Sequence, residues 1–309
     1  MNFTHNNHLK YFIGDREFGH RNNSFEKFNV IVGKIDEQHY KSSNYQEELK
    51  RIADLVYKDL GKDLVVFLSG GTDSEIVVKN FLSIGVKPKC VTIRMNGYND
   101  ADVSIATKIA TDLDLPTTIV DVDIKDYFYS GKAKEFSDEI QCSQITYLMV
   151  YDQIKKMSLP AVMGGELLLK RDIHLNPTSW IHTFRENEDA SAIRFSLKYN
   201  IPLVNEWFSY TPEVMLYYLE DPSIVELVSN KYNYKLSSFS VKNEILKRLL
   251  PDIKIETRKK THGFEKLLGF NLEAMRQLPL NQVQRLESST DGIPIETVVK
   301  MLRGQYGNN

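Results

Sequence analysis

The chain has 309 residues, of which 42% are apolar and 26% charged, a composition that excludes a disordered or collagen-like protein. Its 39 basic and 41 acidic side chains give a net charge of -2, which argues against a sequence-independent nucleic-acid binder. The longest continuous apolar run, 64–68, is far too short to span a membrane, and residues 1–14 lack the apolar core of a signal peptide. We therefore expect a soluble, cytoplasmic protein that makes no membrane contact.

The two cysteines, Cys90 and Cys142, are too few to form a disulfide framework. Neither belongs to a CxxC pair or to any other metal-binding spacing. We expect both to be buried, reduced thiols.

Strand-like and helix-like segments alternate along the middle of the chain. Residues 1–43 hold one expected strand, 27–32, with little helix signal, and are predicted to form a small N-terminal extension. The next expected strands are 64–68, 89–94, 117–122 and 160–163, and the expected helices are 44–60, 74–84, 101–113 and 143–157.

This order of elements predicts an α/β fold with a doubly wound parallel sheet, which binds ligands at the carboxyl ends of its strands. The strand 64–68 is apolar throughout, as expected for a strand that is buried on both faces. We assign the α/β domain to residues 44–195. Residues 196–309 are helical in pattern and are predicted to form a C-terminal lobe that completes the active site.

The loop between the first strand of this series and its helix has the sequence Ser69-Gly70-Gly71-Thr72-Asp73-Ser74. Two glycines permit a tight turn, and the N–H groups at the start of the following helix favour an anion such as phosphate. The hydroxyl groups add donors, and the Asp73 carboxylate can hold a divalent cation beside the phosphates. The loop is neither a Walker A loop nor a GxGxxG fingerprint.

This SGGxDS loop after a buried strand resembles the signature of the PP-loop ATP pyrophosphatase superfamily, which has an adenine nucleotide α-hydrolase-like fold. The resemblance implies that ATP is cleaved between its α and β phosphates, with Mg²⁺ present, and that AMP passes transiently to an acceptor. Adenylation converts a poor leaving group into a good one, so the implied chemistry is sound.

Within the superfamily, the chain most resembles the synthetase domain of asparagine synthetases and of β-lactam-forming synthetases. The absence of CxxC pairs sets aside the thiolation and nitrile-forming branches. The resemblance runs over about residues 45–270 and depends on ordered features: 45–49, 102–114 with 118–120, 162–166, 201–203 with 212–214, and 242–251 with 258–264. It implies an AMP-forming amide ligase.

The residues that this resemblance assigns to the site fall into three groups. The nucleotide-binding residues are expected to be Leu68, Ser69, Gly70, Gly71, Thr72, Asp73, Ser74, Arg94 and Gly164. The metal ligands are expected to be Asp73 with Glu166, or else with Asp172, because the acidic motif after Gly164-Gly165 departs from the family pattern. The catalytic residues are expected to be Lys260 or Lys259, which neutralise charge during adenylation, together with Glu166; His262 is more typical of a structural histidine.

The nitrogen donor and the acyl substrate are not specified by the sequence. The chain begins Met1-Asn2, without the cysteine nucleophile at position 2 that the family's glutaminase domain carries, so we expect ammonia, an amine, or a separate glutaminase partner to supply nitrogen. The substrate is expected to be a small-molecule carboxylate, and a homo-oligomer is left open. Six residues could line the pocket for the acyl substrate or belong to the core: Trp180, His182, Arg185, Arg194, Trp207 and Tyr210.

Two alternative functions stay open. One is modification of a nucleobase in tRNA or DNA, for which the basic residues Lys247, Arg248, Lys254, Arg258, Lys259, Lys260 and Lys266 could contact phosphates, although such a run is usually a solvated face. The other is a nucleotide-binding regulator that keeps the loop without turnover, which the altered acidic motif favours.

Overall fold

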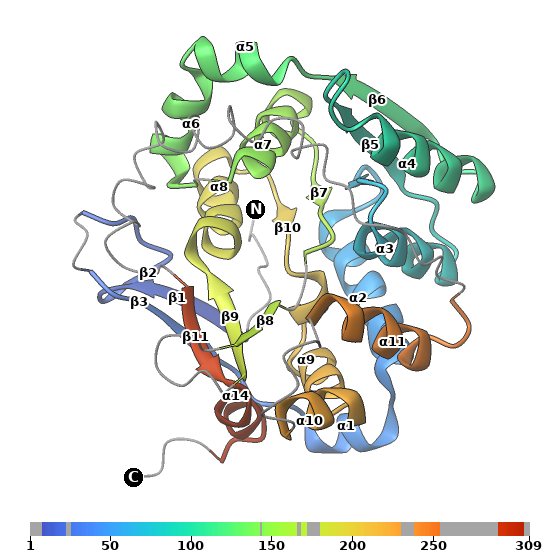
Figure 1. Ribbon diagram of the computed structural model, residues 1–309, viewed down its shortest axis with the longest axis vertical. Helices are drawn as coiled ribbons and strands as arrows, with labels where there is room; N and C mark the ends of the chain where they lie inside the picture. The colour runs from blue at the N-terminus through green and yellow to red at the C-terminus, as the bar shows by residue number, and fades with distance from the viewer. Residues whose placement is uncertain are drawn as a thin grey trace.

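The computed structural model describes residues 8–22, 26–142, 144–165, 168–171, 180–229, 238–253 and 290–305 (Figure 1). Its central feature is a sheet of five parallel strands, in the spatial order β10-β7-β4-β5-β6. The strands are β4 (Val65–Phe67), β5 (Lys89–Arg94), β6 (Thr117–Asp121), β7 (Ala161–Val162) and β10 (Leu203–Val204).

The strand order confirms the predicted doubly wound α/β fold. The chain enters the sheet at its centre, in β4, moves outward through β5 and β6, and then returns to the other side of β4 to add β7 and β10. The direction of winding therefore reverses between β4 and β7. In open α/β sheets, the crevice at such a reversal, beyond the carboxyl ends of the strands, is where ligands bind.

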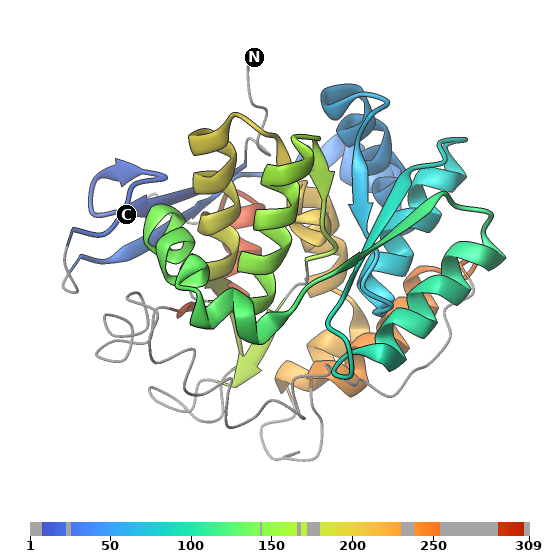
Figure 2. The ribbon, with the colours of Figure 1, turned by 90° about the horizontal axis from the view of Figure 1, so that it is seen from above.

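Helices cover both faces of the sheet because β4 is buried on both. Val66 and Leu68 pack into one hydrophobic core and Val65 and Phe67 into a second one. In Figure 1, α7 and α8 lie to the left of β7 and β10, whereas α2 and α3 lie to the right, and Figure 2 shows this layering from above. The first core receives α2 (Tyr45–Leu60), α3 (Thr72–Ser83), α4 (Asp100–Asp112) and α9 (Pro212–Leu219), and the second receives α5 (Ile124–Tyr129), α6 (Lys132–Ile140), α7 (Ile145–Met157) and α8 (Ser191–Tyr199).

The N-terminal region is richer in structure than its sequence indicated. Instead of one strand, it forms an antiparallel sheet in the order β2-β1-β3, followed by the short helix α1 (Glu37–Ser42). The strands are β1 (Leu9–Ile13), β2 (Arg16–Glu17) and β3 (Phe28–Val32). Leu9, Tyr11 and Ile13 alternate inward along β1 and join the first core, so the sheet is fixed to the rest of the fold by burial.

A third sheet unites distant parts of the chain. It has the antiparallel order β11-β9-β8, with β8 (Leu168–Arg171), β9 (Trp180–Arg185) and β11 (Thr290–Pro294). Beyond residue 195 the described chain is largely helical, as predicted, with α9, α10 (Pro222–Ser229), α11 (Ser238–Leu249) and α14 (Ile295–Leu302). Residues beyond that boundary also supply β10 to the central sheet, and the division of the chain into domains stays a prediction.

Both cysteines are free and buried, as expected. Burial raises the pKa of Cys90 to about 12, which suppresses formation of the reactive thiolate. Of the helices in the described ranges, none is long and apolar enough to cross a membrane.

Candidate functional site

The glycine-rich loop Ser69–Ser74 joins β4 to α3 at the reversal point of the sheet. Gly70 has φ +80°, and a Cβ at this position would lie 2.3 Å from the backbone oxygen of Asp102 in α4. Only glycine avoids both the backbone strain and this clash. The loop is therefore pressed against the start of α4, which fixes its position at the edge of the sheet.

The hydroxyl groups of the loop hold its shape. The Ser74 hydroxyl donates to the carbonyl oxygen of Gly71 at 3.0 Å and accepts from the N–H of Ser69 at 3.2 Å. The N–H of Gly71 donates to the Ser69 hydroxyl at 3.3 Å. Gly71 is the N-cap residue of α3 and has no side chain with which to cap the first turn of that helix. This turn can thus offer N–H groups and the positive end of the helix dipole to an anion.

The carboxylate of Asp73 is paired with an ammonium group from a distant helix. The Nζ atom of Lys242 in α11 lies 2.7 Å from Oδ1 and 2.8 Å from Oδ2 of Asp73. The same Nζ atom lies 6.0 Å from the centroid of the Phe208 ring, in the segment that follows β10. Both side chains of the pair are largely buried. A negative charge from the loop and a positive charge from α11 therefore lie side by side at the carboxyl edge of the sheet.

Two further glycines bring the turns of neighbouring strands together. A Cβ on Gly164, directly after β7, would lie 3.1 Å from the Asp73 Cβ and 3.1 Å from the Ser74 nitrogen. Gly165 has φ +60°, and its Cβ would lie 2.1 Å from the backbone oxygen of Asn205, directly after β10. The turn after β7 is thus packed between the turns after β4 and β10. Gly164, expected from the sequence to bind nucleotide, is placed beside the loop.

A buried phenol from α2 lies near the Asp73 carboxylate. Tyr45 is almost fully buried, and its hydroxyl has no hydrogen-bond partner among the described residues. Burial raises the pKa of Tyr45 well above its usual value, and the proximity of Tyr218 and of the Asp73 charge raises it further. The hydroxyl is therefore a neutral hydrogen-bond donor at physiological pH.

Two of the expected nucleotide-binding residues are engaged elsewhere through their side chains. Arg94 ends β5, and its guanidinium forms a bidentate pair with Asp121 of β6, with Nη2 2.8 Å from Oδ2. Leu68 is fully buried in the first core, and its backbone oxygen accepts from the Thr92 hydroxyl at 2.8 Å. Any contact of Leu68 with a nucleotide must involve its backbone.

Glu166, Asp172, Lys259, Lys260 and His262 lie outside the described residues, so the expected metal set and catalytic lysine stay predictions. Within the described ranges, no group of three or more His, Cys, Asp or Glu residues could hold a metal ion. In the sequence, Lys242 stands out only as the first residue of a helix that resembles the family pattern. Lys242 and Asp73 are 169 positions apart in the sequence, so no local sequence pattern reveals their contact.

The three pocket candidates that the structure describes are all buried; Arg194 and Tyr210 make side-chain hydrogen bonds, whereas the indole N–H of Trp207 has no hydrogen-bond partner among the described residues. Arg194 is buried, and its Nη2 atom lies 3.1 Å from Oε1 of Glu186. Trp207 is buried against Phe81 of α3, with 5.2 Å between ring centroids. Tyr210 donates to Asp59 at 3.4 Å. The side chains of Trp180, His182 and Arg185 lie outside the described part of the chain.

The described portion of the candidate basic patch is small. Lys247 is exposed, whereas Arg248 on the same helix pairs with Asp221 and also donates to Ser223. The other five residues of the patch, Lys254, Arg258, Lys259, Lys260 and Lys266, lie outside the described ranges.

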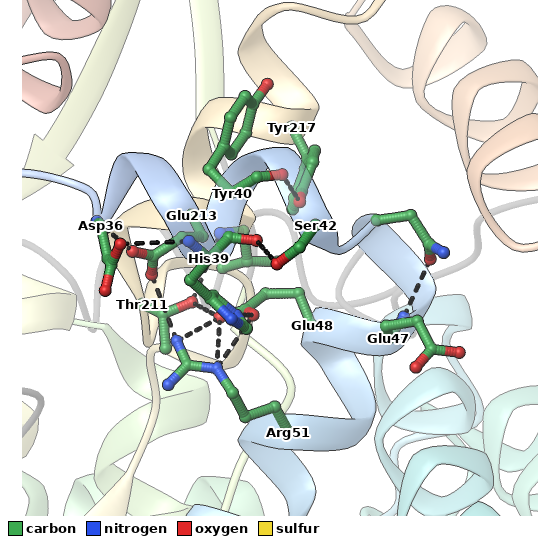
Figure 3. A network of polar contacts seen from close by, with 12 residues as sticks. Asp36, His39, Tyr40, Ser42, Glu47, Glu48, Arg51, Thr211, Glu213 and Tyr217 are labelled. Carbon is green, nitrogen blue, oxygen red and sulfur yellow. Dashed lines mark hydrogen bonds and ion pairs between the residues drawn. The ribbon is translucent and has the colours of Figure 1, made fainter.

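A second polar cluster joins α1, α2 and α9 (Figure 3). Its centre is the buried carboxylate of Glu48, which accepts from Arg51 at 2.6 Å and 2.9 Å, pairs with His39 at 2.7 Å, and accepts from Thr211. Burial raises the pKa of Glu48, but hydrogen bonds from Arg51, Thr211 and His39 outweigh that effect and hold it below its usual value. Glu213 continues the cluster by pairing with Arg51 at 3.2 Å.

Comparison with known proteins gives a limited result. No protein-family model matches the chain, and no curated protein matches it. Among solved structures, a predicted subunit of a tRNA methyltransferase from Methanocaldococcus jannaschii is similar at 14% identity and a TM-score of 0.36, over 70% of this chain and 91% of that one. Similarity also extends to an NMN synthetase from Francisella tularensis, at 10% identity and a TM-score of 0.32, over 72% of this chain and 99% of that one.

The third structure is an NH3-dependent NAD synthetase from Campylobacter jejuni, at 16% identity and a TM-score of 0.31, over 72% of this chain and 99% of that one. Likeness at these TM-scores carries no argument about function.

Proposed function

We propose that this protein is an ATP-dependent ligase that adenylates a carboxylate and forms an amide, with release of AMP and pyrophosphate. The observation that carries the proposal is the Ser69–Ser74 loop at the reversal point of the sheet, with Asp73 and Lys242 paired beside it. Such a loop offers an anion both N–H groups and a helix dipole. Lys242 adds a positive charge to the same edge.

The groups around the loop fit a magnesium polyphosphate. The Asp73 carboxylate and the hydroxyl oxygens of Ser69, Thr72 and Ser74 are the hard oxygen ligands that Mg²⁺ prefers. The first turn of α3 and the Lys242 ammonium would hold phosphate oxygens. When bound, Mg²⁺ would neutralise part of the phosphate charge. Asp73 would then hold the metal while Lys242 contacts the phosphates. Binding of Mg·ATP would therefore break the Asp73–Lys242 ion pair seen in the structure.

Lys242 has the character required of a charge-stabilising residue. During adenylation, negative charge develops on the α-phosphate and on the departing pyrophosphate. A positioned ammonium stabilises that state more than it stabilises bound ATP, so its contribution appears in kcat. We retain Lys260, or Lys259, as a second cation and Glu166 or Asp172 as a second metal ligand.

Nitrogen would come from ammonia, from an amine, or from a separate glutaminase. The direct test is pyrophosphate release from Mg·ATP with a panel of carboxylates, each with and without ammonium chloride, and with glutamine as a separate nitrogen source. Release that requires both a carboxylate and ammonium would support the ligase. Release with tRNA and without any carboxylate would replace it by nucleobase modification, and no release in any mixture would favour the regulator.

A further inference from the structure

Asn205 carries a side-chain amide that is buried at the carboxyl edge of the central sheet. The residue directly follows β10 and is 3% exposed. Both its Oδ1 and its Nδ2 atom are buried, and neither has a hydrogen-bond partner among the residues that the structure describes. An unpaired buried polar group commonly costs about 1–3 kcal/mol. The positions of Oδ1 and Nδ2 therefore require an explanation.

A second buried asparagine shows what a structural amide does in the same protein. Asn99, 9% exposed, precedes α4. Its Oδ1 accepts from the Met95 N–H at 2.7 Å, and its Nδ2 donates to the Ile93 carbonyl oxygen at 2.9 Å. Both ends of the Asn99 side chain are thus satisfied by backbone. Asn205 differs in that neither end of its amide meets such a partner in the described chain.

The position of Asn205 connects it to the loop. Its backbone oxygen meets Gly165, and the adjoining Gly164 meets Asp73. Strand β10 is two strands from β4, and neighbouring strands are about 4.8 Å apart, so Asn205 and the loop share one edge at a separation on the order of 10 Å. This distance suits a small molecule whose reacting carboxylate lies beside the nucleotide phosphates.

We propose that Asn205 binds the second substrate of the proposed ligase, through an uncharged group of that substrate that both donates and accepts hydrogen bonds. An asparagine amide pairs in this way with a carboxamide or with a nucleobase edge. The inference rests on the proposed function, because it takes the loop to be the nucleotide site.

The first experiment compares thermal unfolding of Asn205→Leu and Asn99→Leu with that of the wild type, in the absence of ligands. Leucine is close in size and removes the polar atoms, so a binding role predicts that Asn205→Leu keeps or raises Tm. Asn99→Leu breaks two hydrogen bonds and should lower Tm by about 5 °C or more. A comparable fall in Asn205→Leu would show that its amide holds the fold, and would overturn the inference.

The second experiment measures ligand-induced shifts of Tm with matched probes in the presence of Mg·ATP. The probes are asparagine and aspartate, glutamine and glutamate, and the nucleosides adenosine, cytidine and uridine. We expect stabilisation by at least one amide or nucleoside and not by the acids, and its loss in both Asn205→Leu and the isosteric Asn205→Asp. A response to an amide favours a small-molecule substrate, and one to a nucleoside favours a nucleobase. No response, a response only to acids, or a response that both variants keep would overturn the inference.

The stabilisation by Mg·ATP alone separates this inference from the proposed function. Asn205→Leu should keep that stabilisation, since Asn205 lies on the β10 side of the sheet edge. If the wild type shows no response to Mg·ATP, the proposed function fails. If it responds and Asn205→Leu responds to every probe as the wild type does, only the role of Asn205 fails.

Discussion

The two polar regions of this protein differ in whether they close on themselves. Around Glu48, Arg51 of α2, His39 of α1 and the hydroxyl of Thr211, the residue before α9, satisfy a buried carboxylate (Figure 3). At the carboxyl edge of the sheet, the amide of Asn205 and the hydroxyl of Tyr45 have no partner among the described residues. In the first region the buried carboxylate is hydrogen-bonded within the fold, whereas the second region contains buried polar groups that could form hydrogen bonds to a ligand.

The presence of charged side chains does not by itself distinguish a structural polar cluster from a binding site. Both regions contain a buried or half-buried carboxylate beside a cation, so an ion pair by itself does not mark a site. At the reversal point of the sheet, the second region adds a glycine-rich loop, a helix start without a side-chain cap, and buried polar atoms that have no hydrogen-bond partner among the described residues. Substitutions in the two regions should therefore have different consequences.

The largest effect is expected at Asp73. Asp73→Asn keeps the shape of the side chain and removes the charge that would hold the metal, so pyrophosphate formation should fall by at least a factor on the order of 10²–10³, by analogy with other preorganised polar contacts. Circular dichroism should be unchanged. Asp112→Asn, an exposed α4 residue that pairs with Lys108, is the control. Normal turnover in Asp73→Asn would remove the loop from catalysis.

Lys242 should be next in size. Lys242→Ala is expected to lower kcat for pyrophosphate release by a factor on the order of 10² with little change in the KM for ATP. Lys242→Arg, which keeps the charge, should recover part of the rate. Lys247→Ala, on the exposed side of the same helix, should behave as the wild type. A rise in KM at constant kcat would assign Lys242 to ATP binding only.

The catalytic lysine inferred from the family resemblance is tested by a paired comparison. We expect Lys260→Ala to slow pyrophosphate release severely and Lys259→Ala to be mild, because only one of two adjacent side chains is expected to face the phosphates. Steady-state rates at saturating ATP measure both. Reversed severities would move the role to Lys259, and two mild variants would leave Lys242 as the principal cation.

In the closed cluster, substitution should affect stability and spare the chemistry. Glu48→Gln removes a buried charge that pairs with Arg51 and His39, and should reduce the free energy of unfolding by about 2–3 kcal/mol, measured with urea. Glu47→Gln, one residue earlier and exposed, should change it by about 0.5 kcal/mol or less. The rate per folded molecule should be unaffected by either. Loss of turnover in folded Glu48→Gln would contradict the distinction between the regions.

The smallest effect is a pH dependence of the same cluster. The pKa of Glu48 is lowered in the folded state, so the unfolded state binds the proton more readily. The stabilisation that Glu48 provides should be complete above the pKa of this residue in the unfolded state, near 4.5. It should decline as pH falls through the lower pKa of the folded state. Urea unfolding of the wild type and Glu48→Gln between pH 3 and 7 should show a stability difference that shrinks below about pH 4.5. A constant difference would show that Glu48 does not titrate with folding.

The sequence was sufficient for the elements with strong local patterns. The apolar run at 64–68 and the β-branched strand Lys89–Arg94 have clear signals, and both lie in the sheet as expected. The glycine-rich loop was identified from its composition and its place between a strand and a helix. These features depend on neighbouring residues alone, which is why a single sequence reveals them.

The rest depended on contacts between distant residues. Strand β10 has two residues, too few to show a period, and it is recognisable only by its pairing with β7. The pairing of Lys242 with Asp73 and the burial of the Asn205 amide, which has no hydrogen-bond partner in the described part of the chain, arise from packing across the sheet edge. No local pattern distinguishes these side chains from the solvated lysines and turn asparagines found throughout the chain.

The separation of Asp73 and Lys242 also has a consequence in time. The two residues are 169 positions apart, so synthesis of the chain at about 5–20 residues per second leaves a delay of roughly ten to thirty seconds between them. During this interval the nascent chain already carries the loop, β4 and α3, but not the lysine that neutralises Asp73. A ribosome-bound chain that ends before α11 therefore carries the Asp73 carboxylate and the phosphate-binding loop without the Lys242 ammonium that lies beside them in the complete fold.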